Sequence, residues 1–165
     1  MYQYSFANVD LLIQVPDASG DYQDVHVSGY GTGENLISVT RRAPLANVMF
    51  GAYGDMVVSM QQIQAADLSF QILMNAPENK ILQDYANYFH SLARKDGELV
   101  YPIQGFIKDN MGNDQVTLTN GVILQMPALS RGQTMSTNTW TLTFEKSDFL
   151  RGNGDDAESL GFNFI

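Results

Sequence analysis

Apolar and polar side chains alternate with a period of two along most of the chain, which is typical of β-strands. The first such segment, Val9 to Val15, ends at the turn residues 16–20, and a strand over 22–30 is expected to return beside it as a hairpin. The sequence therefore predicts a mainly β body. The remaining strands are expected over 36–39, 56–61, 68–74, 99–108, 116–124 and 137–146.

One segment departs from this alternation and predicts a single α-helix over 76–96. Asn75 and Glu78 have the spacing of a capping box, and Pro77 falls in the first turn, where its missing N–H costs nothing. Gly97 can end the helix in a left-handed conformation. Apolar residues recur at intervals of three and four, so we expect one face to pack on a β-layer of the same chain. That face consists of Ile81, Tyr85, Tyr88, Phe89 and Leu92.

The alternation is lost between residues 43 and 54, where one proline and two glycines interrupt the chain. This predicts a loop of about a dozen residues, close to the length at which loops are usually functional. Two adjacent basic residues, Arg41 and Arg42, precede it in an otherwise acidic chain.

Composition favours one domain, because 165 residues suffice for a real core. We expect a β-domain over 1–150 that contains helix 76–96, and a C-terminal extension over 151–165. Cysteine is absent, which excludes disulfides and thiolate metal sites. Neither a signal peptide nor a membrane helix is predicted, so no membrane insertion is expected. Only 16 % of residues are charged, which is compatible with broad subunit contacts, since uncharged polar groups cost less to desolvate than ions.

The net charge of −9 disfavours an ordinary nucleic-acid-binding role, because such a chain repels phosphates. Gly29, Gly31 and Gly33 lead into another strand and are interpreted as a turn, and the Asn- and Asp-rich segment 109–114 as a hairpin turn without a calcium site. The residues around His26 and His90 in the sequence do not indicate a catalytic dyad or a metal site. We therefore predict no enzyme, no cofactor and no metal.

Several segments together resemble bacteriophage tail tube proteins of the contractile-tailed type. The opening Tyr4-Ser5-Phe6-Ala7-Asn8-Val9 is similar to the start of one such family, and the glycine-rich turn 29–33 follows. The resemblance is clearest over 55–88, where two strands lead to an Asn-x-Pro helix entry, and it continues to the Trp-Thr-Leu-Thr-Phe strand 140–144. Tube proteins of type VI secretion systems and R-type pyocins are similar in design.

This resemblance implies a small β-barrel or β-sandwich flanked by one helix, the tail-tube fold. It implies hexameric rings that stack into a tube inside a contractile sheath, with DNA passing through the lumen without specific binding. The implied partners are further copies of the chain, the sheath protein, the tape-measure protein, and the baseplate and tail-terminator proteins. The location would be the phage tail of the virion, assembled in the host cytoplasm.

Other interpretations of the residues stay open. A monomeric β-sandwich binding module would use loop 43–54 for recognition, and a type VI secretion-like tube protein would share the assembly design. A secreted effector or small enzyme on a β-barrel has no residue set to support it.

Within the tube interpretation, specific residues are expected at two surfaces. Arg41, Arg42 and Asp55 belong to the loop that would reach the neighbouring ring. The bore would be lined by hairpins over 34–64 and 98–125, with the helix outside toward the sheath, and would be polar and acidic. The expected lumen-facing residues are Asp55, Ser59, Gln61, Glu98 and Asp114.

Overall fold

The computed structural model describes residues 5–6, 9–17, 19–30, 36–92, 101–110 and 112–152, with only the backbone of Leu92 included. Within these ranges, nine strands and one helix form a mainly β fold, as predicted. The helix is not long and apolar enough to cross a membrane. The elements are β1 (Val9–Pro16), β2 (Tyr22–Val27), β3 (Ile37–Arg41), β4 (Ala46–Phe50), β5 (Met56–Met60), β6 (Ala66–Leu73), α1 (Glu78–Leu92), β7 (Ile103–Asp109), β8 (Gln115–Gln125) and β9 (Thr137–Leu150).

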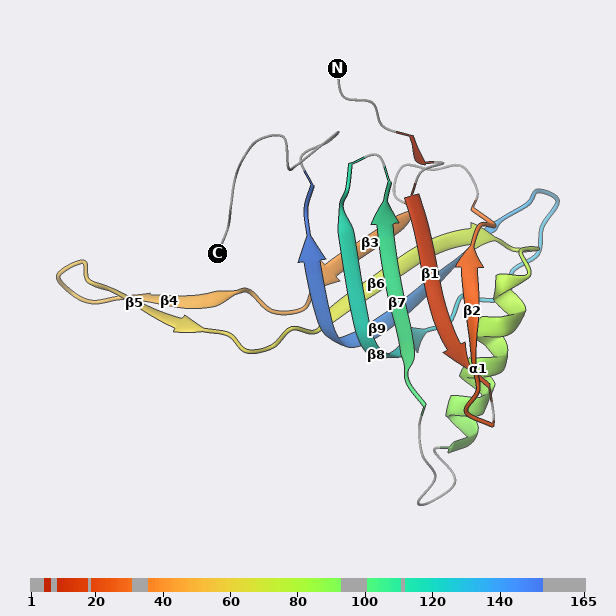
Figure 1. The fold of residues 1–165 in the computed structure, drawn as a ribbon, viewed down its shortest axis with the longest axis horizontal. Coiled ribbons are helices and arrows are strands. Elements are labelled where there is room, and N and C mark those ends of the chain that lie inside the picture. Colours follow the sequence, from red (N-terminus) through yellow and green to blue (C-terminus); the bar gives the residue numbers. More distant parts are fainter. Residues whose placement is uncertain are drawn as a thin grey trace.

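Seven strands form one antiparallel sheet in the order β2-β1-β7-β8-β9-β6-β3. This sheet folds over itself, so that β1, β2 and β7 lie in front of β3, β6 and part of β9 (Figure 1). β4 and β5 pair only with each other, as a separate two-stranded sheet. The fold is a small β-sandwich with one flanking helix.

A bulge in the middle of β8 helps to bend the sheet. Asn120 has a positive φ of 57° and no partner in either neighbouring ladder, while Gly121 pairs with both Ile103 and Phe144. An extra residue of this kind bends a strand and increases its twist. The register of β7 against this part of β8 shifts between Ile103 and Gly105.

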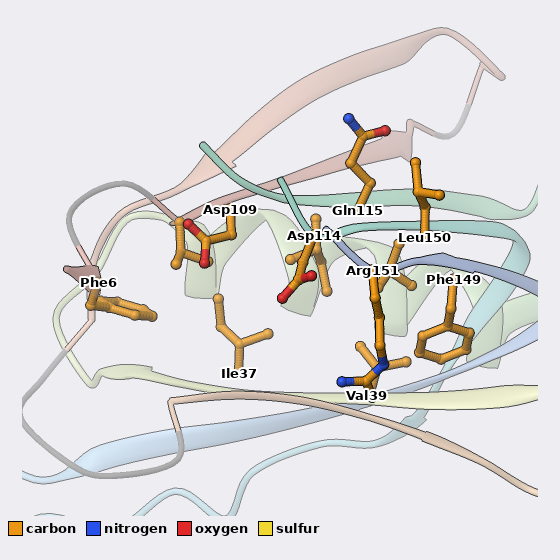
Figure 2. A pocket seen from close by; sticks show the side chains of 12 residues that line it. Phe6, Ile37, Val39, Asp109, Asp114, Gln115, Phe149, Leu150 and Arg151 are labelled. Carbon is orange, nitrogen blue, oxygen red and sulfur yellow. The ribbon is translucent and has the colours of Figure 1, made fainter. Parts of the chain in front are cut away.

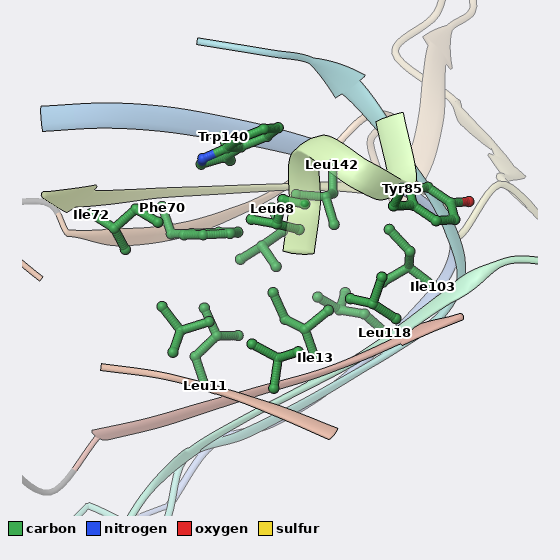
Figure 3. Close-up of a cluster of buried hydrophobic side chains, with 14 of the residues drawn as sticks. Leu11, Ile13, Leu68, Phe70, Ile72, Tyr85, Ile103, Leu118, Trp140 and Leu142 are labelled. Atoms are coloured by element: carbon green, nitrogen blue, oxygen red, sulfur yellow. The ribbon is translucent and has the colours of Figure 1, made fainter. Parts of the chain in front are cut away.

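The core lies between the two layers, as the alternation predicts (Figure 3). The inward residues of β6 and β9 are almost fully buried, while the residues between them are partly exposed. The β-strand periodicity therefore placed these faces correctly. The largest buried side chains are Trp140, Phe70, Phe144, Leu11, Ile13, Leu68, Ile72, Ile103, Leu118 and Leu142, together with Leu82 of α1.

Helix α1 packs on this core, but its buried face is rotated slightly from the predicted one. Leu82, Tyr85 and Ala86 are buried, whereas Ile81 and Phe89 are only partly so. Tyr88 is likewise half-exposed and the side chain of Leu92 lies outside the described part, as do residues 93–97 with their expected helix end. The helix therefore contacts the β-layer mainly through the turn that contains Leu82 and Ala86.

The predicted capping box is wrong. Glu78 does not turn back to Asn75; its Oε1 accepts hydrogen bonds from the N–H (3.1 Å) and hydroxyl (3.3 Å) of Ser28, and its Oε2 has no hydrogen-bond partner. Gly29 allows this close approach, because a Cβ at that position would lie 3.1 Å from Glu78 Oε2 and collide with Ala76. Glu78 thus attaches the start of the helix to the end of β2.

Candidate assembly surface

Among the described residues, no group of three or more His, Cys, Asp or Glu side chains could hold a metal ion. His26 is exposed on β2 and His90 is exposed on α1, so the two imidazoles lie on different elements of the surface.

An open hollow of about 320 Å³ lies at one end of the sandwich (Figure 2). Apolar side chains, among them Ile37, Val39 and Phe149, make up most of its wall. Asp114 and Arg151 lie at the same hollow, and Asp114 Oδ1 accepts a hydrogen bond from the Gly152 N–H at 2.7 Å. This carboxylate joins the end of β9 to the turn that precedes β8. The remaining lining residues are Phe6, Val9, Ile107, Asp109, Gln115, Val116 and Leu150.

The segment 43–54, expected to be a loop, instead contains strand β4, so that prediction is wrong, whereas the strand expected over 56–61 is confirmed as β5. Together the two strands form a β-hairpin. β4 and β5 pair from Ala46↔Met60 to Phe50↔Met56 and extend away from the body (Figure 1). Their connection is tight: Gly54 N–H donates to the Gly51 carbonyl at 3.1 Å, and Gly54 has a φ of 88°. A turn followed by a left-handed glycine is a common hairpin closure. We call residues 43–64 the arm.

The arm exposes apolar side chains on both faces. Val48, Phe50 and Val58 share one face with further apolar residues, while Met49 and Val57 share the other with polar residues. Phe50 is 71 % exposed and Tyr53, at the tip, is 97 % exposed. Contiguous exposed apolar surface of this kind marks a protein interaction site in a soluble chain. The first face consists of Ala46, Val48, Phe50, Met56, Val58 and Met60, and the second contains Asn47, Met49, Val57 and Ser59.

The base of the arm is held firmly on the body. Arg41 Nη2 donates to the Ile63 carbonyl at 3.0 Å, and Ser147 Oγ donates to the Gln64 carbonyl at 2.8 Å. Arg42 Nε lies 2.7 Å from Asp67 Oδ1 in an ion pair, and its Nη2 also contacts the Thr143 hydroxyl at 3.3 Å. The two arginines therefore make contacts within their own chain and fix the direction in which the arm leaves it.

A second exposed apolar surface lies on the other side of the body, at the connection between β8 and β9 (Figure 1). Two hollows of about 310 and 420 Å³ open there and share Met126 in their walls. The smaller one lies between α1 and the end of β8, and residues such as Ala86, Phe89 and Ile123 line it. We call this region the β8–β9 surface. Its exposed apolar residues are Leu124, Met126, Leu129 and Met135.

The residues predicted at the two tube surfaces are only partly brought together. Asp55 and Ser59 are exposed on the arm, and Gln61 is half-buried where its N–H donates to the Leu45 carbonyl at 3.0 Å. Asp114 is exposed far from them in the β7–β8 turn, and Glu98 lies outside the described residues. The expected hairpin over 34–64 does not exist as one unit, since β3 pairs with β6. The hairpin within 98–125 is confirmed as β7 and β8.

Sequence reasoning missed the β8–β9 surface altogether. The available signal was the run of Leu124, Met126 and Leu129 across a turn region, since turn segments are usually polar. For the arm, the signal was Gly51 and Gly54 flanked by apolar residues, which marks a hairpin closure as well as a loop.

The chain is thus a β-sandwich with one flanking helix and a projecting arm that exposes apolar side chains. A family profile described as "Bacteriophage PhiTE tail tube protein" matches residues 1–152, and the chain belongs to this family. The resemblance to phage tail tube proteins is thereby confirmed, and with it a structural role in a phage tail. No curated protein sequence matches the chain.

Solved structures of contractile systems share the fold. The anti-feeding prophage cap, described as a tube-terminating cap, aligns with a TM-score of 0.54 at 10 % identity over 92 % of this chain and 93 % of that one. The sheath/tube terminator of an extracellular contractile injection system, PVC, aligns with a TM-score of 0.55 at 11 % identity over 91 % and 98 %. A chain of the PVC sheath–tube complex aligns with a TM-score of 0.50 at 11 % identity over 86 % and 88 %.

Proposed function

We propose that this chain is a non-enzymatic structural subunit of a contractile phage tail tube. Subunits form hexameric rings, and the rings stack into a channel through which DNA leaves the virion. The arm is the observation that carries this proposal. An isolated hairpin is marginally stable in water, and one face of this arm consists wholly of apolar residues, so that face is suited to being covered by other chains.

In the assembled tube, the arm contacts neighbouring subunits, with Asp55 near its tip and with Arg41 and Arg42 setting its direction at the base. The partly polar face that bears Ser59 suits a position toward water, and Gln61 follows it at the arm's base. We assign these two residues, together with Glu98 and Asp114, to a polar, acidic bore. Such a bore repels phosphate, so DNA passes without sticking.

The further partners follow from the same role. The sheath would surround the tube, the tape-measure protein would occupy the bore before DNA, and baseplate and terminator proteins would bind its two ends. Assembly would take place in the host cytoplasm. The family membership supports this set, since the family is one of phage tail tube proteins.

Assembly of the purified protein tests the proposal. We expect rings or tubes with six-fold symmetry by negative-stain electron microscopy. The double variant Phe50→Asp/Val58→Asp, which places two charges on the apolar face of the arm, should remain an 18.3 kDa monomer by light scattering. Ser59→Asp, on the opposite face, is the matched control and should still assemble. A wild-type protein that stays monomeric at all concentrations and salt conditions would favour the binding-module interpretation and overturn the proposal.

A further inference from the structure

The arm and the β8–β9 surface lie on opposite sides of one subunit (Figure 1). The arm therefore cannot cover the β8–β9 surface of its own chain. When two different patches of one chain are complementary, copies associate head to tail and form rings or filaments. The question is whether these two patches are complementary.

Their apolar parts match in kind. The tip of the arm presents Tyr53, which is almost fully exposed, beside Phe50. The β8–β9 surface has a hollow of about 310 Å³ between α1 and β8, lined by residues that include Phe89, Ile123 and Met126. An aromatic side chain in an apolar pocket is the usual anchor of a protein interface.

Their charges match as well. Asp55 is the only charged residue between positions 43 and 64, and Arg131 is the only charged residue between positions 124 and 136. Both side chains are exposed, and Arg131 Nη1 donates to the neighbouring Ser130 carbonyl at 2.9 Å. Each segment thus carries one charged side chain, and the two charges are opposite. Such a pair fixes orientation and partner choice more than it adds affinity.

We propose that the arm of one subunit docks on the β8–β9 surface of a second copy of this chain, with Tyr53 in the hollow between α1 and β8 and Asp55 paired with Arg131. This inference rests on the proposed tube function and names the surface that receives the arm. It also gives α1 a role in assembly, since Ala86, Asn87 and Phe89 line the receiving hollow.

Intermolecular disulfide formation tests the contact directly, because the native chain contains no cysteine. Ala52→Cys places a thiol at the tip of the arm without altering Tyr53 or Asp55, and Asn87→Cys places one at the rim of the hollow. Mixed and oxidised, these two variants should give a disulfide-linked dimer. The control mixture replaces Asn87→Cys with His26→Cys, an exposed position on β2, and should give at least tenfold less dimer. Equal cross-linking in both mixtures would overturn the inference.

Charge reversal tests the pair. Asp55→Arg and Arg131→Asp should each reduce the Asn87 cross-link at least about fivefold, and the double variant should restore most of it, because the pair is re-formed in the opposite sense. A double variant no better than the weaker single variant would contradict the pairing. Electron microscopy separates this result from the proposed function. Tubes that form without the Asn87 cross-link would refute only the docking site, whereas dimers that never close into rings would refute the tube.

Discussion

The indole Nε1 of Trp140 donates a hydrogen bond of 2.9 Å to Oδ1 of Asn79 and so joins β9 to the first turn of the helix. The same oxygen accepts from Asn138 Nδ2 at 3.1 Å, while Asn79 Nδ2 donates to the carbonyls of Leu73 and Ala76. One amide side chain therefore satisfies polar groups of β9, of β6 and of the turn that precedes α1. Helix α1 is positioned on the core through this contact as well as through its apolar face.

Replacement of Asn79 by Ala should lower the free energy of unfolding by about 1–3 kcal/mol, because it leaves the N–H of a Trp140 that is only 1 % exposed without its acceptor. Trp140 is the only tryptophan of the chain, so its fluorescence in urea titrations measures the loss. Asn87→Ala, at an exposed position of the same helix, is the control and should change stability by less than about 0.5 kcal/mol. Equal effects at the two positions would contradict the assigned role.

Gly121→Ala should destabilise the subunit by about 1–3 kcal/mol, since the new methyl group would overlap the ring of Phe144 in a packed core. Gly132→Ala, where a Cβ meets no atom within 4 Å, should be nearly neutral in the isolated subunit. Thermal unfolding followed by circular dichroism compares the two. A neutral Gly121→Ala would mean that Phe144 does not pack against this strand.

Stability should fall at alkaline pH because of Tyr85. Burial, followed by the charges of Tyr22 and Tyr88, raises the pKa of Tyr85 from 10.0 to about 12, and its hydroxyl donates to the Tyr101 carbonyl at 3.0 Å. The folded state thus favours the protonated phenol. Its contribution is complete below the unfolded pKa and is lost as pH rises from about 10 to about 12.

Tyr85→Phe should remove this part of the pH dependence and cost about 0.5–1.5 kcal/mol at neutral pH for the lost hydrogen bond. Urea midpoints of both proteins at pH 8 and pH 11.5 provide the measurement. The wild type should lose more stability between these two values than the variant does. Equal losses of stability in the two proteins would assign the effect to other groups, such as Tyr30. The pKa of Tyr30 is also raised, by burial and by the charges of Glu78 and Asp10.

Arg42→Glu should destabilise the subunit itself, because it puts a carboxylate beside Asp67 in place of the ion pair. Arg42→Ala should cost less than about 1 kcal/mol, since the pair is partly exposed. Arg42 therefore has a role within its own chain, which must be measured separately from any role in contacts between rings. The difference between the Ala and Glu variants, measured on the monomeric Phe50→Asp/Val58→Asp background, isolates the effect within one chain.

Local signals in the sequence predicted local structure well. The helix was found from the three- and four-residue spacing of its apolar side chains, and the strands around Phe70 and Leu142 from their period of two. The choice of Leu82 and Ala86 as the centre of the helix contact depends on the angle at which the helix meets the sheet, which no local pattern encodes. The partner of Glu78 is Ser28, 50 positions away, so the capping-box spacing was misleading.

The strand predicted over 56–61 is confirmed as β5, but β4, the other half of the arm, was missed for a different physical reason. Neither face of β4 packs on the body, so its sequence has no need for the alternation that identifies a half-buried strand. Glycines can close a hairpin, but they can also mark a loop without strands. The pairing of Val48 with Val58 distinguishes a hairpin from a loop here, and this pairing is visible only in the structure. The β8–β9 surface, which includes Leu124 and Met126, was missed for another reason. Its hollow forms only because α1 lies beside the end of β8, and this arrangement cannot be inferred from the local sequence.

The position of β9 in the sheet has a consequence for assembly, because this strand is synthesised after the other strands that the structure describes. β9 is the last strand in sequence among the described residues, yet it lies inside the sheet between β8 and β6. A chain that stops before Thr137 leaves β8 paired only with β7 and β6 paired only with β3, and its helix lacks the contact between Asn79 and Trp140. The arm, however, would already have been made. In the proposed assembly, only a chain that includes β9 would therefore present a folded arm and a folded β8–β9 surface together, and copies truncated before β9 should not extend a tail.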